Sequence, residues 1–406
     1  MNAETVNKIL GITEAYKMPE ALMSKLMNGP TELFNKFMEV GEPLDHDWFT
    51  EYFQTEHGDR DKLKQDYTPD SVCEIATSVS GVAGVVGDIC SGTGGLTLKA
   101  WQHGAKEFYC IEYSSRAIPV LLTNLAIRNI KATVIHGDAL TKETFNAYKL
   151  TPSDRYSTIE VIEDTENIQD FKCDSIIMNP PYSMKWDGER MFFGYETPPK
   201  SKCDYAFVLD GLEKLKDGGS LVAILPHGVL FRSSKEGEIR KQLLLDNMFD
   251  SVVGLPENLF LNTAIPVCIL KWKKNKRADD VLFVDASKKF EKRGKLNVMT
   301  DDHITSTVNL FRLREDVSKL THVANLKEFE SNSFNLNIPR YVDTYEPPEP
   351  INIIETMKEL YEIEQETKQA AQNISNQLHQ LTSSDCQIDK DAKAVAEWWD
   401  KIYGLK

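Results

Sequence analysis

Ser175-Ile176-Ile177-Met178-Asn179-Pro180-Pro181-Tyr182 joins a short apolar run to a rigid turn. The apolar half, Ser175 to Met178, is typical of a buried strand. The two prolines cannot continue a strand, and they stiffen the backbone that follows it. An amide, a rigid carbonyl and an aromatic ring therefore stand together at the carboxyl end of a strand. In open α/β sheets ligands bind at this edge, and we expect the site there.

A glycine-rich turn lies upstream. Asp88-Ile89-Cys90-Ser91-Gly92-Thr93-Gly94-Gly95 follows the apolar run Val82 to Val86. Its three glycines allow the backbone to approach a ligand closely and to point amides at it. The spacing is not Gly-x-Gly-x-x-Gly, and the Gly-Lys-Ser/Thr of a phosphate-binding loop is missing, which disfavours a triphosphate. A glycine-rich turn after one strand and Asn-Pro-Pro-Tyr after a later one together indicate methyl transfer to an amino nitrogen.

Three carboxylates close successive predicted strands: Asp88, Glu112 and Asp138. Glu112 is placed to accept hydrogen bonds from both hydroxyls of a ribose, and Asp138 could accept one from an adenine amino group. A single carboxylate at a strand end is more often a turn or helix-cap residue, but three on successive strands favour a ligand. A nucleoside-bearing cofactor without a polyphosphate fits them, and S-adenosylmethionine is the obvious candidate.

The Asn-Pro-Pro-Tyr turn supplies what an exocyclic amine on an aromatic base needs. Such an amine is a poor nucleophile, and its lone pair becomes available when its two N–H groups donate hydrogen bonds. The Asn179 side-chain oxygen and the Pro180 carbonyl can accept them, and these bonds strengthen as positive charge builds on nitrogen. Tyr182 offers a ring on which a flipped base can stack. No metal is needed, and we expect no metal site. The turn alone admits adenine N6 and cytosine N4 as targets.

Strand and helix patterns alternate along the middle of the chain, which predicts an α/β fold with a doubly wound, mostly parallel, Rossmann-like sheet of seven strands. The predicted strands are Val85–Ile89, Phe108–Ile111, Thr133–His136, Ser175–Met178, Ser220–Leu225, Ser251–Leu255 and Val267–Trp272, the last two forming a hairpin. The predicted helices include Leu96–Trp101, Ala117–Ile127, Tyr205–Leu215 and Glu236–Leu244. The acidic segment Ser153–Lys172 is predicted to be a surface insertion.

Two further regions flank this part of the chain. Residues 1–66 have a helical, polar pattern with short apolar stripes and no chemical motif. The linker signal Glu346-Pro347-Pro348-Glu349-Pro350 follows, so the predicted domains are 1–66, 67–345 and 346–406. Beyond the linker, a coiled-coil-like helix is predicted from positions repeating every seven residues, which are Ile353, Leu360, Thr367, Ile374 and Leu381. A seam of this length is more typical of a helix that meets a partner helix than of one folded back on the core.

The chain has 406 residues and a formal net charge of −15. This charge is unfavourable for binding nucleic acid, so a DNA substrate would require a local basic face or a partner subunit. The densest basic runs, Lys271–Arg277 and Lys288–Lys295, are equally consistent with phosphate contacts and with solvated strand ends. The seven scattered cysteines predict reduced thiols in a cytoplasmic protein. No apolar run approaches the roughly 20 residues that span a membrane.

Several ordered blocks between Asp66 and Val342 resemble the modification (M) subunit of type I DNA restriction-modification systems, within the adenine-N6 DNA methyltransferases. The blocks are Asp66-Tyr67-Thr68-Pro69, Asp88–Gly95, Asn179–Tyr182, Asp204–Phe207, Leu225–Phe231, Gly254–Phe260, Asp285–Ser287 and Asn335–Tyr341. The resemblance implies methyl transfer from S-adenosylmethionine to the N6 of adenine at a specific site in double-stranded DNA. The implied catalytic residues are Asn179, Pro180, Pro181 and Tyr182. The implied cofactor-binding residues are Tyr67, Thr68, Pro69, Asp88, Ser91, Gly92, Thr93, Gly94, Glu112, Asp138, Ala139 and Asn179.

The resemblance also implies partners, because in this family a separate specificity subunit reads the DNA sequence and packs on terminal helices of the M subunit. We therefore expect a specificity subunit on the C-terminal helices, with a restriction subunit as a further candidate partner. The chain departs from the family at Ile89, in place of proline, and at Ser91, in place of cysteine. Tyr182 stands where many M subunits carry Phe, and the N-terminal helical region is short. Two alternatives are a protein glutamine N5-methyltransferase, a class that also uses Asn-Pro-Pro-Tyr, and a catalytically silent DNA-binding or assembly subunit.

Overall fold

The computed structural model describes residues 1–56, 67–188, 190–192, 194–261, 263–345 and 352–405. Contacts divide the chain into two units, Met1–Thr344 and Tyr345–Lys406. The predicted boundary at residue 66 lies outside the described residues, and the division into three domains remains a prediction. In the described part of the chain, no helix is both long enough and apolar enough to cross a membrane.

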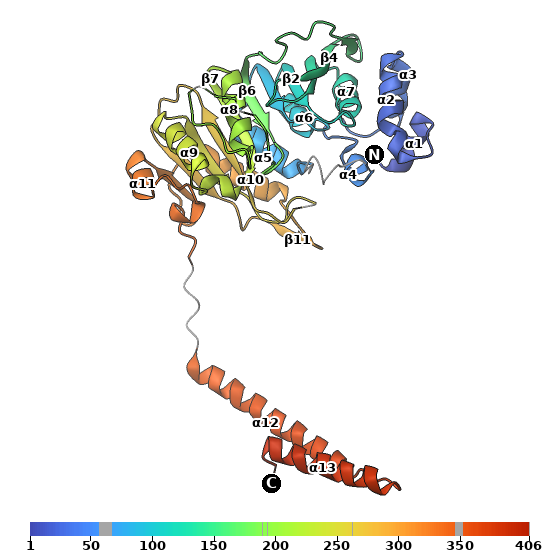
Figure 1. Ribbon diagram of the computed structural model, residues 1–406, viewed down its shortest axis with the longest axis vertical. Coiled ribbons are helices and arrows are strands. Elements are labelled where there is room, and N and C mark those ends of the chain that lie inside the picture. The colour runs from blue at the N-terminus through green and yellow to red at the C-terminus, as the bar shows by residue number, and fades with distance from the viewer. Residues whose placement is uncertain (57–66, 189, 193, 262, 346–351, 406) are drawn as a thin grey trace. The chain divides into compact units, whose positions relative to one another are not determined.

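One sheet runs through the first unit (Figure 1). Its eleven described strands lie in the order β13-β10-β8-β9-β7-β6-β1-β2-β3-β4-β5. Every strand except β4, β9 and β13 runs in the same direction. The strands are β1 (Val85–Ile89), β2 (Glu107–Glu112), β3 (Ala132–Gly137), β4 (Thr144–Thr151), β5 (Thr158–Val161), β6 (Cys173–Met178), β7 (Leu215–Pro226), β8 (Phe249–Gly254), β9 (Val267–Lys273), β10 (Val281–Asp285) and β13 (Thr321–Ala324). A separate hairpin pairs β11 (Glu291–Arg293) with β12 (Leu296–Val298).

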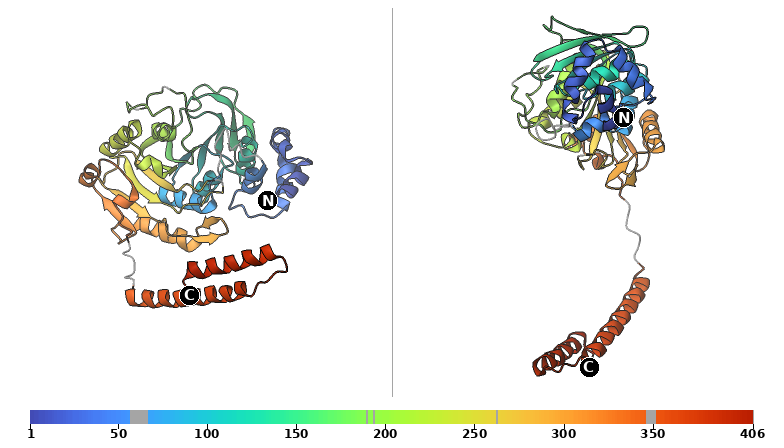
Figure 2. Two further views of the ribbon diagram at one scale, coloured as in Figure 1. Left: turned by 60° about the horizontal axis from the view of Figure 1, so that its bottom comes forward. Right: turned by 90° about the vertical axis from the view of Figure 1, so that its right-hand side faces the viewer.

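Helices cover both faces of this sheet (Figures 1 and 2). Side chains alternate along the strands, so Ile177 of β6 joins one hydrophobic cluster while Ile176 and Met178 join the other. The first cluster includes residues of α5 (Asp70–Ser80), α6 (Gly95–Gln102), α7 (Ile118–Ile127) and α10 (Asp301–Leu313). The second includes residues of α8 (Asp204–Lys214), α9 (Lys235–Leu245) and α11 (Leu326–Ser331). The predicted doubly wound, mostly parallel α/β fold is confirmed.

The sheet is larger than the seven predicted strands. The predicted hairpin is present, with β9 inserted between β7 and β8. One edge is extended by β4 and β5, and β5 falls inside the segment predicted to be a surface insertion. Alternation in β4 is weak, since only Ala147, Tyr148 and Leu150 are buried, and β5 is mostly exposed. The other edge is extended by β10 and β13, and β10 is a short, almost wholly buried apolar run.

The N-terminal residues form α1 (Ala3–Leu10), α2 (Met18–Met27), α3 (Thr31–Glu39) and α4 (Thr50–Glu56), with a 3-10 turn at Ala15–Lys17. The predicted apolar stripes are buried: Leu22 and Leu26 of α2, and Phe34 and Phe37 of α3. These side chains belong to the same hydrophobic cluster as α5, α6 and α7, and α2 packs on α7 (Figure 1). The N-terminal helices therefore share a core with one face of the sheet.

The second unit is a helical hairpin of α12 (Ile353–His379) and α13 (Cys386–Tyr403). Asp400 of α13 accepts hydrogen bonds from Ser375 and His379 of α12, and Trp399 Nε1 donates to the Ala371 carbonyl at 3.0 Å. Most of the predicted heptad positions stay exposed within this unit, including Ile353, Leu360, Ile374 and Leu381, and Met357 between them is exposed as well. An apolar stripe on α12 is therefore not covered by α13.

Gly137 at the end of β3 is predicted to tolerate no side chain. A Cβ there would lie 2.3 Å from the Glu143 backbone oxygen and 3.1 Å from Thr144 Cα, where β4 begins. We expect Gly137→Ala to lower the free energy of unfolding by roughly 1–3 kcal/mol, as overpacking does. In Gly237→Ala, the control on α9, the nearest atom lies 3.5 Å away, so stability should be kept or gained. Urea unfolding of both variants tests this, and equal stability of the two would contradict it.

Candidate active site

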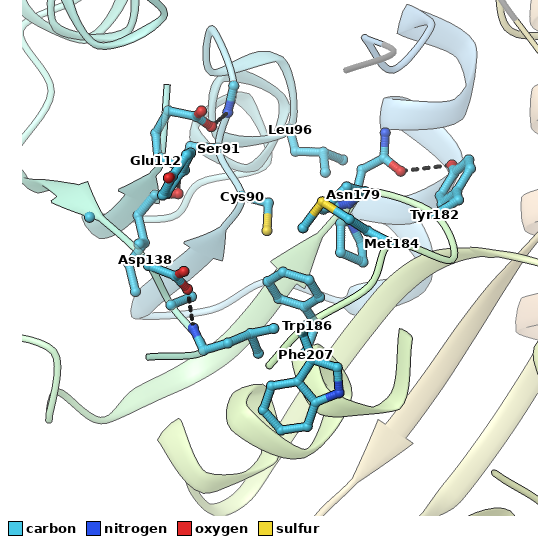
Figure 3. A pocket seen from close by; sticks show the side chains of 18 of the residues that line it. Cys90, Ser91, Leu96, Glu112, Asp138, Asn179, Tyr182, Met184, Trp186 and Phe207 are labelled. Atoms are coloured by element: carbon cyan, nitrogen blue, oxygen red, sulfur yellow. Dashed lines mark hydrogen bonds between the residues drawn. The ribbon is translucent and has the colours of Figure 1, made fainter. Parts of the chain in front are cut away.

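A cavity of about 440 Å³ opens where β1, β2, β3 and β6 end (Figure 3). Its lining comes from the glycine-rich turn after β1, from Ile111–Tyr113 and Gly137–Thr141, and from Asn179–Tyr182. The described walls also include the loop Met184–Gly188, Leu96 of α6, Phe207 of α8 and Thr50 of α4, together with Tyr67 and Thr68. The two sequence blocks that indicated methyl transfer therefore face one cavity.

Most of the predicted site residues line this cavity. They are Tyr67, Thr68, Ser91, Gly92, Thr93, Glu112, Asp138, Ala139, Asn179, Pro180, Pro181 and Tyr182. Pro69, Asp88 and Gly94 are not among the lining residues. Pro69 and Gly94 directly precede α5 and α6, and Asp88 is wholly buried in β1. The ligand contacts of all these residues remain predictions.

The glycine-rich turn is bent by residues in the left-handed region. Gly92 has φ +56° and Gly94 φ +100°, which glycine adopts without steric cost. A Cβ on Gly92 would lie 3.3 Å from the Tyr67 ring. Cys90 also has positive φ, at +90°, and its sulfur faces the cavity (Figure 3). The Cys90 and Ser91 amides donate to the Ile111 carbonyl at 2.9 and 3.0 Å, which ties the turn to β2.

Glu112 links β2 to the same turn. One carboxylate oxygen accepts from the Gly92 amide at 2.7 Å (Figure 3). The other accepts from the Ser114 amide at 2.7 Å. Burial raises the pKa of Glu112 above its ordinary value, while the hydrogen bonds from Ser114 and Gly92 oppose this shift. The Glu112 carboxylate is thus held at the cavity wall beside the backbone of Gly92, which has no side chain to block a ligand.

Asp138 occupies the turn after β3. Its Oδ1 accepts from the Leu140 amide at 2.8 Å (Figure 3). The same oxygen accepts from the Thr141 amide at 3.2 Å. This is the local turn role that the sequence left open for strand-end carboxylates. The residue nevertheless lines the cavity, so the turn orients a carboxylate towards it.

Asn179 is held from two sides. Its Nδ2 donates to Thr68 Oγ1 at 2.8 Å. On the other side, Tyr182 Oη donates to Asn179 Oδ1 at 2.7 Å (Figure 3). Because Thr68 takes the amide nitrogen, the oxygen of the amide is directed to the side of Tyr182. The Tyr182 ring is half-buried and meets Phe260 edge-on, with centroids 6.2 Å apart.

Asp204, at the start of α8, anchors the residue that follows this turn. Its side chain is fully buried, and Oδ1 accepts from the Ser183 amide at 3.0 Å. Arg232 donates to the other oxygen at 3.0 Å and also to Glu236 at 3.0 Å. Ser183 has φ +50°, so this ion-paired carboxylate stabilises a strained backbone next to the Asn-Pro-Pro-Tyr turn.

Sequence reasoning missed several lining residues. Trp186 is buried in the loop after Ser183, where its ring nitrogen donates to the Pro199 carbonyl at 3.2 Å. Met184 and Tyr113 also line the cavity, and no motif marks them. Phe207 lies in the block Asp204–Phe207, which carried the family resemblance, and this block could have predicted its place in the site. Thr50 comes from the N-terminal region, where no chemistry was predicted.

Asp88 makes the stability of the fold depend on pH. Burial raises its pKa to about 7, although Thr97 Oγ1 donates to Oδ2 at 2.6 Å. Between the ordinary pKa of 3.8 and this value, the folded protein holds a proton that the unfolded chain releases. The resulting stabilisation is complete below the unfolded pKa and is lost as pH rises through about 7.

The Asp88→Asn variant removes the titrating carboxyl and with it this pH-dependent contribution to stability. Relative to wild type, we expect its free energy of unfolding to be higher at pH 8 than at pH 5, by on the order of 2 kcal/mol. Urea unfolding at both pH values measures the difference. A difference between the two proteins that does not change with pH would contradict the assignment.

Several known proteins are similar to this chain. Residues 46–349 match the family model described as N-6 DNA Methylase. The MpnII type I restriction enzyme methylase subunit of Mycoplasma pneumoniae is 27% identical over 310 residues, which cover 71% of this chain and 54% of that protein. The MjaVII type I methylase subunit of Methanocaldococcus jannaschii is 30% identical over 222 residues, covering 50% of this chain and 38% of that protein.

A solved structure is also similar. The methyltransferase subunit of a type I restriction-modification system from Streptococcus thermophilus superposes with a TM-score of 0.63 at 31% identity, over 81% of this chain and 67% of that chain. The chain spans about half or less of the length of the two curated relatives. Because the family model matches most of the chain, the protein belongs to the N-6 DNA methylase family.

Proposed function

We propose that this chain is a modification subunit of a type I restriction-modification system that methylates the N6 amine of adenine in double-stranded DNA. The observation that carries the proposal is that Asn179 of the Asn-Pro-Pro-Tyr turn and Gly92 of the glycine-rich turn line the same cavity. Membership of the N-6 DNA methylase family favours adenine over cytosine, and it disfavours a protein glutamine substrate.

S-adenosylmethionine fits the residues that line this cavity. A volume of about 440 Å³ is in the usual range for small-molecule sites. The described lining residues include the carboxylates Glu112, Asp138 and Asp187 but a single cation, Lys185, which favours a positively charged ligand and disfavours a polyphosphate. Glu112 would take the ribose hydroxyls, and Asp138 with Phe207 would hold the adenine. When bound, this cofactor supplies a methyl group on a positively charged sulfur.

The chain's own residues would prepare the target amine. Asn179 Oδ1 and the Pro180 carbonyl would accept its two N–H groups, and these bonds gain strength as the nitrogen becomes positive. Oδ1 already accepts from Tyr182 Oη, and a carbonyl oxygen has room for a second donor. The base must leave the duplex to reach this position, and the Tyr182 ring offers a stacking surface for it.

The proposal includes a specificity subunit as a partner. The net charge of −15 leaves the chain poorly suited to hold DNA alone. The exposed apolar stripe of α12, at Ile353, Met357 and Leu360, is suited to pack on a partner helix. A restriction subunit would join such a complex as a further partner. A catalytically silent subunit is the remaining alternative, and the complete Asn-Pro-Pro-Tyr turn disfavours it.

Methyl transfer to unmethylated DNA tests the proposal, with the modified nucleosides identified by mass spectrometry. Wild type with the specificity subunit from the same genome should produce N6-methyladenine. Asn179→Ala should lower the rate roughly 100-fold or more, because it removes an acceptor that acts in the transition state. Asn28→Ala, the same change at the exposed end of α2, should match wild type.

The outcomes separate the alternatives. Methylation that needs the second subunit would support recognition of the DNA by a specificity subunit, whereas methylation by the chain alone would contradict it. N4-methylcytosine as the product would refute the adenine assignment. Cofactor binding without any DNA methylation would contradict the proposed activity and favour a catalytically silent subunit.

Thr68 is predicted to orient Asn179. Thr68→Val removes the oxygen that accepts from Asn179 Nδ2, so the amide loses a restraint on its direction. We expect kcat to fall roughly 10- to 100-fold, as small misplacements of a reacting group do. Thr68→Ser keeps the hydroxyl and should retain most of the activity. A weaker S-adenosylmethionine affinity with unchanged kcat would instead assign Thr68 to cofactor binding alone.

A further inference from the structure

The segment Leu44–Thr50 of the N-terminal region lies against α6 and α7. Arg128, directly after α7, anchors it, since Nε donates to the Leu44 carbonyl at 2.8 Å and Nη2 to the His46 carbonyl at 2.5 Å. The guanidinium also lies 4.9 Å from the centre of the buried Trp48 ring. From α6, Gln102 donates to the Asp45 carbonyl at 2.5 Å. The segment is thus fixed by several polar bonds and one buried aromatic ring.

Asp47 in this segment reaches the glycine-rich turn. Its Oδ2 accepts a short hydrogen bond from Thr93 Oγ1, and its Oδ1 accepts from Asn124 Nδ2 at 2.7 Å. The same Asn124 nitrogen donates to the Thr93 carbonyl at 2.9 Å. Thr93 is only 2% exposed. Its side chain and its backbone are both hydrogen-bonded to residues outside the turn.

These bonds act where the turn is least constrained by its own residues. Thr93 lies between Gly92 and Gly94, which both have positive φ and wide conformational freedom. Gly92 lines the cavity and donates its amide to Glu112 at 2.7 Å. Fixing Thr93 therefore limits the positions available to the Gly92 backbone and to the Glu112 carboxylate that it contacts.

We propose that Asp47 is a positioning residue for the cofactor: by fixing Thr93, it makes the affinity for S-adenosylmethionine depend on the docking of Leu44–Thr50. This inference rests on the function proposed above. Thr50, three residues beyond Asp47, lines the cavity itself. Binding free energies are reciprocal, so the bound cofactor should in turn stabilise the docked segment.

Calorimetric titration with S-adenosylmethionine tests this on the full chain. Asp47→Ala removes both acceptor oxygens, and we expect the dissociation constant to rise roughly tenfold or more. Asp47→Asn is the rescue variant, because its oxygen can accept from Asn124 while its nitrogen donates to the Thr93 hydroxyl, so it should bind more tightly than Asp47→Ala. Asp45→Ala is the matched control, since that carboxylate is exposed and hydrogen-bonds to the neighbouring His46.

A second measurement needs no variant. Hydrogen exchange of wild-type backbone amides in residues 44–50 should slow when S-adenosylmethionine is added, because the ligand and the docked segment stabilise each other. This keeps the inference testable even where Asp47→Ala fails to fold. Unchanged exchange in that segment, with the cofactor bound, would overturn it.

The remaining outcomes are distinct. Asp47→Ala binding as tightly as wild type would overturn the inference and leave the proposed function intact. Equal weakening by Asp47→Ala and Asp45→Ala would reduce the effect to the loss of a negative charge and would also overturn it. Wild type that fails to bind S-adenosylmethionine would remove the proposed function on which the inference rests.

Discussion

The parallel register of β1, β2 and β6 is the constraint on which the site depends. Asp88 of β1 lies beside Cys110 of β2 and Ile177 of β6, so the three strands end almost level. Each strand then delivers its next residues to the same cavity. A slip of one residue would move buried side chains such as Ile177 to the opposite face, and the two hydrophobic clusters oppose such a slip. The packing that stabilises the fold therefore also brings Gly92, Glu112 and Asn179 together.

Around this cavity, one kind of interaction recurs: carboxylates hold backbone and side-chain donors in fixed positions. Glu112 holds the Gly92 amide, Asp138 holds the Leu140 amide, and Asp204 holds the Ser183 amide. Asp47 extends the same device to the N-terminal region through Thr93. The acids that shape the site also give it a negative character, which suits a sulfonium ligand and not a phosphate backbone. The cavity therefore suits the proposed cofactor, and the proposed partner subunit would hold the DNA.

The sequence predicted the central strands, and most of the site residues that it named line the cavity, because strand-ending motifs report local backbone geometry. Val85–Ile89 was predicted with the bounds that the structure has, and Asn179 with Gly92 was expected at one sheet edge. The edge strands β4 and β5 were missed because weakly alternating, exposed residues carry little periodic signal. Asp47 and Trp186 were missed for another reason. Their roles arise from contacts with residues far along the chain, Thr93 and Pro199 among them, and no local pattern encodes such contacts.

The most direct test of this account is a crystal structure of the protein with S-adenosylhomocysteine. The account predicts the ligand in the cavity at the ends of β1, β2 and β3, with its ribose hydroxyls on Glu112 and its adenine between Asp138 and Phe207. The sulfur should face the side of the cavity that carries Asn179, Pro180 and Tyr182, where a target amine would approach. A ligand bound elsewhere, or one whose sulfur points away from Asn179, would contradict the central claim that the two strand-end turns form one methyl-transfer site.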